Sequence, residues 1–114
     1  MKTIYKYTLN PGEANRFRTK RLLQVCHVAP VIDEEVRREM VQHGHPSREA
    51  NIRAERINVW CLVDPSAEQI SDFVIFGTGH PIEGDIVFCG TAVMASGLVW
   101  HLFVPDKDFY VGSR

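Results

Sequence analysis

Short apolar runs rich in β-branched and aromatic residues recur along this chain, and most of them end at a proline or a glycine. They predict strands at residues 4–9, 22–28, 57–63, 73–76, 86–93 and 98–104. The last four runs are joined by short connections, and because parallel neighbours need longer crossovers, we expect antiparallel pairing. The pattern predicts a mainly β (α+β) fold, a small antiparallel sheet sandwich or a partly open barrel of about six strands with one inserted helix.

The segment at about residues 31–56 differs in kind, because it is rich in charged residues and holds few large apolar ones. Asp33 suits the N-cap of a helix, and Val36 and Met40 recur at helical spacing. We therefore expect a helix inserted between two strands. From Ser47 onward two alternatives remain open, a second short helix or a mobile stretch.

Length and composition narrow the class of protein. A chain of 114 residues cannot easily build two cores, so residues 1–114 are expected to form a single domain. The formal net charge of −1 does not favour a nucleic-acid partner. No apolar run reaches membrane-spanning length and the N-terminus lacks the apolar stretch of a signal peptide, so no membrane association is expected. Cys26, Cys61 and Cys89 lie in apolar runs without CxxC spacing, which favours buried, reduced thiols and a cytoplasmic location.

Charge is unevenly distributed along the sequence. The charged residues among residues 1–21 are mostly basic, whereas those from Asp64 onward are mostly acidic. Either folding mixes these two populations, or the surface is bipolar and steers a partner electrostatically.

Five phrases of the sequence form a recognisable series. They are KTIYKY at residues 2–7, WCLVDP at 60–65, FGTGHPI at 76–82, GT at 90–91 and LVWHLF at 98–103. In this order they resemble a family of small phage and prophage proteins of unknown function. The resemblance covers residues 2–28 and 57–103, and the charged insertion departs from the family's pattern. It brings no established activity, but it implies a phage or prophage origin and a place in the cytoplasm of the bacterial host.

The insertion offers one candidate binding site. Its arginines could pair with carboxylates of a partner protein, and we expect the contacts at Arg37, Arg38, Arg53 and Arg56. Glutamates interleaved with them make uniform phosphate binding less favourable. The alternative is a solvated helix face with i, i+4 charge pairs and no partner.

The turn between two predicted strands offers a second candidate. Gly77, Thr78, Gly79 and His80 could form an anion-binding nest for a small, nucleotide-like ligand, with Trp60 or Trp100 stacking on it. The turn lacks the length and the lysine of a Walker loop. The alternative is a structural turn in which His80 bonds to the backbone.

No catalytic residue, metal ligand set or cofactor is expected. The chain has no nucleophile elbow and no recognisable pair of catalytic carboxylates. Its five histidines, His27, His43, His45, His80 and His101, show no zinc-binding spacing. Whether His27, His80 and His101 converge in space is left open.

These observations favour a non-catalytic, phage-encoded protein that binds a host or defence-system protein, for instance as an inhibitor of an anti-phage system. The main alternative is a module that binds or sequesters a small ligand at the turn of residues 77–81. A third is a self-associating structural protein, in which an edge strand such as residues 3–9 pairs between two copies to form a homodimer.

Overall fold

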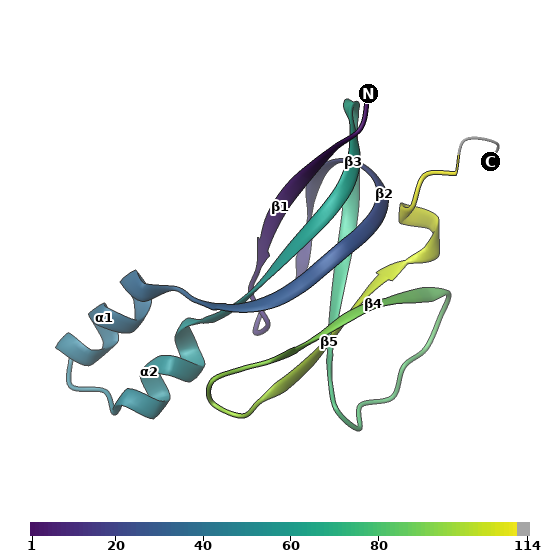
Figure 1. The fold of residues 1–114 in the computed structure, drawn as a ribbon. Coiled ribbons are helices and arrows are strands. Elements are labelled where there is room, and N and C mark those ends of the chain that lie inside the picture. The colour runs from purple at the N-terminus through teal and green to yellow at the C-terminus, as the bar shows by residue number, and fades with distance from the viewer. Residues whose placement is uncertain (112–114) are drawn as a thin grey trace.

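The computed structural model describes residues 1–111 of the chain, which form five strands, two α-helices and one short 3₁₀-helix (Figure 1). In chain order they are β1 (Thr3–Leu9), β2 (Asn15–Ile32), α1 (Glu34–Gln42), α2 (Ser47–Ala54), β3 (Glu55–Gly77), β4 (Ile86–Val93), β5 (Val99–Pro105) and η1 (Asp106–Asp108). Neither α-helix in this described part of the chain has the length and hydropathy that a membrane crossing requires.

All strand pairs are antiparallel, in the order β1-β3-β5-β4, and β2 pairs with β3. Among the described residues 1–111 the sheet does not close into a barrel. The mainly β prediction is therefore confirmed, with five strands in place of about six. The difference arises because the runs at 57–63 and 73–76 are two halves of the single strand β3.

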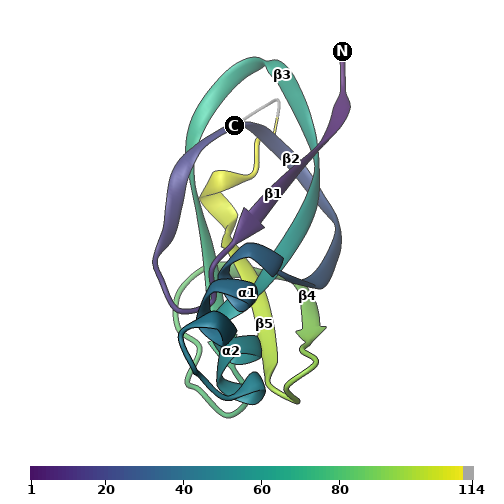
Figure 2. The same cartoon turned by 90° about the vertical axis from the view of Figure 1, so that its left-hand side faces the viewer.

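A corner in β3 joins these two halves. The pairing with β2 passes from Arg21↔Asp64 to Lys20↔Glu68, so residues 65–67 have no partner in the register. Here the hydroxyl and the amide of Ser66 donate to Asp64 Oδ1 at 2.6 and 3.0 Å, and they lower the pKa of that carboxyl. Figure 2 shows β3 rising, turning over and descending again, with β2 following it. The corner thus folds one sheet into two layers that face each other.

The core fills the space between the two layers. Alternate residues of the first half of β3, from Ile57 to Val63, are fully buried, and so is Leu9 of β1. Leu102 and Val104 of β5 are buried in the same core from the other layer. This alternation is the period-two pattern of strands with one buried face.

Cross-strand ion pairs combine the basic and acidic stretches of the sequence. Arg16 lies 2.9 Å from Asp72, and Lys20 lies 3.0 Å from Glu68. These pairs are exposed and contribute little stability each. They show that folding mixes the two charge populations in this region, which was the first of the two alternatives.

The insertion forms a helical hairpin, α1 and α2, which projects from one end of the sheet (Figure 1). Asp33 caps α1 as expected, because its Oδ1 accepts a hydrogen bond from the amide of Val36 at 3.2 Å. The pair Ile32↔Glu55 closes the base of the hairpin. One inserted helix was expected and two are found, and the stretch after Ser47 is the second short helix rather than a mobile segment.

The three cysteines differ in burial. Cys61 is buried, Cys89 is half-buried and Cys26 is exposed, so the expectation of three buried thiols is wrong for Cys26. The register of β2 shifts between Val25 and His27, which places Cys26 in an irregularity of the strand. Burial raises the pKa of the Cys61 thiol to about 12 and that of the Cys89 thiol to about 11.

These pKa values predict a graded reactivity. At about pH 8, iodoacetamide is expected to alkylate Cys26 first, because the thiolate is the reactive form and the other two thiols stay protonated and shielded. Intact mass should show one early adduct in the native protein and three in denaturant. Three equally fast adducts on the native protein would contradict the assignment.

The raised pKa values of Cys61 and Cys89 also predict how stability depends on pH. The unfolded chain releases the protons of these two thiols near pH 9.0, whereas the native chain keeps them, so the free energy of unfolding should fall as pH rises above that value.

Candidate functional site

A groove of about 540 Å³ lies where the helical hairpin meets the end of the sheet. We call it the helix–sheet groove. Its apolar side chains come from α1, α2, β5 and the turn before β5, and they are Val36, Met40, Ile52, Leu98 and Trp100. Its polar side chains are Asn10, Glu13, Arg53, Glu55 and Arg56. Segments far apart in the sequence therefore build one concave surface.

The apolar wall of the groove is only partly covered by the rest of the molecule. Val36 and Met40 lie one helical turn apart on α1, a helix in which no residue is fully buried. Ile52 of α2 is 38% exposed, and Leu98 is 41% exposed. The apolar stripe of α1 thus lines a groove rather than a core, and it is available to another molecule.

Two of the four predicted arginines line this groove. The Arg56 guanidinium donates to the backbone carbonyls of Arg53 and Glu55 at 2.8 and 2.9 Å, which caps the end of α2. The Arg53 side chain is 66% exposed, and its Nε lies 3.8 Å from the carboxylate of Glu49. Arg53 therefore remains available to a partner's carboxylate, whereas Arg56 holds the local backbone in place.

The other two arginines lie outside the groove. Arg37 donates two hydrogen bonds to Glu34, at 2.9 and 2.6 Å. Arg38 is two residues from both Val36 and Met40, which places it on the opposite side of α1 at about 100° per residue. Within residues 1–111 its side chain makes no hydrogen bond or ion pair. The structure therefore does not gather the four arginines into one patch.

Glu55 fixes the floor of the groove. Its side chain is buried, and its carboxylate accepts hydrogen bonds from the hydroxyl and the amide of Ser96 at 2.7 and 3.1 Å. This contact ties the base of the helical hairpin to the turn between β4 and β5. Sequence reasoning missed this contact, and it also missed Leu98 and the turn at Asn10 as parts of the site. The stripe at Val36 and Met40 and the predicted contacts at Arg53 and Arg56 were the sequence signals that pointed to the groove.

The second candidate, the turn at Gly77, is held together by its own atoms. His80 Nδ1 accepts a hydrogen bond from the amide of Gly77 at 3.1 Å, and the amide of His80 donates to the Gly77 carbonyl at 3.2 Å. Gly79 has φ +89°, a conformation that favours glycine. The Gly77 amide is thus occupied by His80, while Thr78 and His80 line a separate hollow of about 380 Å³ with Leu98 and Trp100. Trp100 stands between the two candidate sites.

Of the three histidines whose convergence was left open, His80 and His101 lie in one region and His27 lies in another. His101 is held through both ring nitrogens, by the hydroxyls of Thr78 and Thr91 at 2.9 Å each. It therefore belongs to the same turn region as His80. His27 instead packs on Trp60, with ring centroids 5.4 Å apart. In the part of the chain that the structure describes, no three His, Cys, Asp or Glu side chains gather as metal ligands would.

Comparison with known proteins gives one family. The model of a domain of unknown function, DUF7352, matches residues 1–111. The chain belongs to the DUF7352 family. The matched span runs through all five strands and includes the helical hairpin at Glu34–Ala54. No curated protein and no solved structure matches the chain.

This match confirms the prediction that the chain belongs to a family of unknown function, and the family's description assigns no activity. Because the matched span contains both walls of the helix–sheet groove, the groove is built from residues that lie within the DUF7352 region.

Proposed function

We propose that this DUF7352 protein is a non-catalytic, phage-encoded binding protein that acts in the cytoplasm of the bacterial host on a host or defence protein, as its inhibitor. The observation that supports the proposal is the helix–sheet groove, a concave surface with an exposed apolar wall and an exposed arginine at its rim. The resemblance of the strand phrases to small phage and prophage proteins supports the origin and the compartment.

The composition of the groove indicates the chemistry of its partner. Met40, Ile52 and Trp100 offer apolar area that a partner's aliphatic or aromatic side chain would cover. Arg53 would pair with a carboxylate on the same partner segment, because its guanidinium presents a rigid fork of donors. Trp and Arg are also the residue types that contribute most to binding at protein interfaces. A partner segment with an apolar anchor next to an acidic residue fits this surface best.

One substitution pair tests the proposal. We expect Met40→Asp to weaken binding of the partner by at least about tenfold, because it places a charge in the apolar wall. Val41→Asp is the matched control, since Val41 is the next residue of α1 and is 44% exposed outside the groove lining. The chain and both variants, each carrying a photo-crosslinker at Ile52, would be expressed in phage-infected bacteria, and the covalent adducts would be identified by mass spectrometry.

The proposal requires an adduct with one bacterial protein that survives Val41→Asp and is lost in Met40→Asp. Purified components would then give the two affinities. If Met40→Asp binds as tightly as the unmodified chain, the groove is not the binding site and the proposal fails.

Trp100 also favours a second candidate, a small-ligand module. It lines the hollow beside Thr78 and His80, so an aromatic ligand such as a nucleotide could stack on it there. A ligand that binds only the native state raises the apparent stability, so thermal unfolding against a nucleotide panel would detect it. A shift that His80→Ala abolishes and Met40→Asp retains would assign the function to this hollow.

A further inference from the structure

Three neighbouring strand segments of the sheet carry no charged side chain. Residues 73–77 of β3, all of β4 and all of β5 contain no Asp, Glu, Lys or Arg. Because Leu102 and Val104 of β5 point into the core, the residues that alternate with them point outward. We call this outward side the uncharged face, and its side chains include Phe76, Phe88, Thr91, Val93, His101 and Phe103.

Aromatic rings form the centre of the uncharged face. Phe103 contacts Phe76 and Phe88, with both pairs of ring centroids 5.5 Å apart in edge-to-face geometry. These contacts leave Phe103 9% exposed, while Phe88 is 57% exposed and Val93 62% exposed. A row of large apolar side chains therefore projects into solvent beside the last strand of the sheet.

The polar side chains of the uncharged face already have hydrogen-bond partners. One ring nitrogen of His101 bonds to Thr91 on the same face and the other to Thr78 in the turn after β3, at 2.9 Å each. Burying a polar group is costly when it lacks a hydrogen-bond partner, and these groups already have theirs. A second molecule can cover this face without leaving an orphaned side-chain donor or acceptor.

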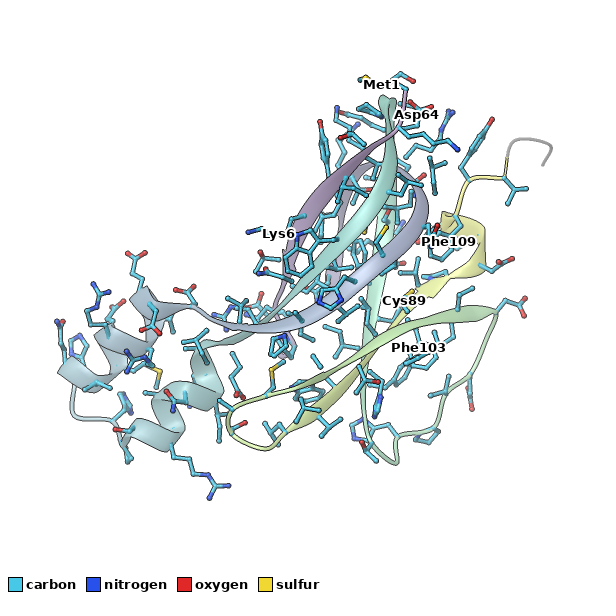
Figure 3. All side chains as sticks on the ribbon, in the orientation of Figure 1. Met1, Lys6, Asp64, Cys89, Phe103 and Phe109 are labelled. Atoms are coloured by element: carbon cyan, nitrogen blue, oxygen red, sulfur yellow. The ribbon has the colours of Figure 1, made fainter. Side chains whose placement is uncertain are left out.

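The rest of the sheet surface is different. The outward side of residues 15–20 and 68–72 carries ion pairs, such as Arg16 with Asp72. The edge strand β1 carries Lys6, which Figure 3 labels on the upper layer, whereas Phe103 is labelled on the lower one. Charged side chains are a common protection of sheet edges against unwanted association. β4, which ends the strand order, has no charge and no proline.

We propose that the uncharged face docks on the same face of a second copy of this chain. In a twofold dimer each surface patch meets itself, so a patch of one charge sign would repel its own copy, whereas this one carries no Asp, Glu, Lys or Arg. The molecule's net charge of −1 adds little repulsion between the copies. This proposal is independent of the helix–sheet groove, whose lining residues do not belong to the uncharged face.

The size of the face predicts a weak dimer. Three strands spaced about 4.8 Å apart and some seven residues long span on the order of 300 Å² in projection. Stable interfaces bury roughly 800 Å² on each partner, so the dimer is expected to dissociate on dilution.

Sedimentation equilibrium over an approximately hundredfold range of protein concentration tests the proposal. The unmodified chain is expected to pass from monomer to dimer as concentration rises. Phe88→Arg and Val93→Arg should each remain monomeric, because each brings two like charges together across the twofold axis. Ile4→Arg is the matched control, since Ile4 is 50% exposed on β1, and it should dimerise like the unmodified chain.

Circular dichroism and thermal unfolding of the dilute variants would show that each charged variant is folded. A chain that stays monomeric at the highest concentration would overturn the proposal. So would Phe88→Arg and Val93→Arg variants that dimerise normally. Loss of the dimer in Ile4→Arg alone would place the interface on the β1 edge instead.

Discussion

Phe73→Ala is expected to lower the free energy of unfolding by about 3–5 kcal/mol, the range for loss of a buried aromatic side chain. Phe73 is 3% exposed, and its ring lies 5.5 Å from that of Phe17 and 6.1 Å from that of Tyr7. Phe17 and Phe73 belong to the descending half of the folded sheet, while Tyr7 belongs to β1 on the other layer. The substitution therefore removes a contact between the layers as well as buried area.

The matched control is Ile70→Ala, which truncates a side chain three residues earlier on the same strand. Ile70 is 47% exposed, so its loss is expected to change the free energy of unfolding by less than about 1 kcal/mol. Urea denaturation followed by circular dichroism would give both values, at a protein concentration where the chain is monomeric. Similar losses for the two variants would mean that the aromatic cluster does not hold the layers together.

The helical hairpin could be predicted well from local sequence signals. Asp33 forms the N-cap, because a carboxylate ahead of a helix satisfies an amide that no intrahelical carbonyl reaches. The stripe of Val36 and Met40 correctly indicated a helix with one apolar side. What that side faces was beyond local signals, since Leu98 precedes β5 and Trp100 lies in β5, both more than forty residues away in the sequence.

The corner at Asp64 shows where local reading fails. Asp-Pro-Ser was expected to end one strand, because proline cannot donate to a strand ladder. The structure retains a turn there, with Ser66 bonded to Asp64, yet β2 pairs with β3 on both sides of it. The register with a distant strand, rather than the residues of the corner, decides that the two halves are one strand.

The four arginines of the predicted partner site illustrate the same limit. Their charges are visible in the sequence, but their directions depend on helix phase and on nearby acceptors. Arg53 lines the groove, while Arg37 is engaged by Glu34. A composition argument treats all four alike, whereas the fold separates them.

Gly90→Ala is expected to destabilise the protein by about 1–3 kcal/mol, the usual cost of overpacking a core. A Cβ built on Gly90 would lie 2.7 Å from Val28 Cγ2 and 2.9 Å from Val28 Cβ. In residues 1–111 no strand pairing joins β2 to β4, so this side-chain contact closes the open side of the sheet. Val28 is β-branched and stiff, and its Cβ is attached directly to the backbone, so the strands themselves would have to move apart.

A double-mutant cycle with Val28→Ala isolates this contact. Val28→Ala alone should destabilise by removing two methyl groups, but in the Gly90→Ala background it also removes the clashing Cγ2. We therefore expect the double variant to be more stable than the sum of the single effects predicts, by about 0.5–3 kcal/mol. Because Val28 Cβ remains at 2.9 Å, the rescue should be incomplete. Strictly additive effects in urea denaturation would show that β4 does not rest on β2 at Gly90, and that the open side of the sheet is wider than this contact allows.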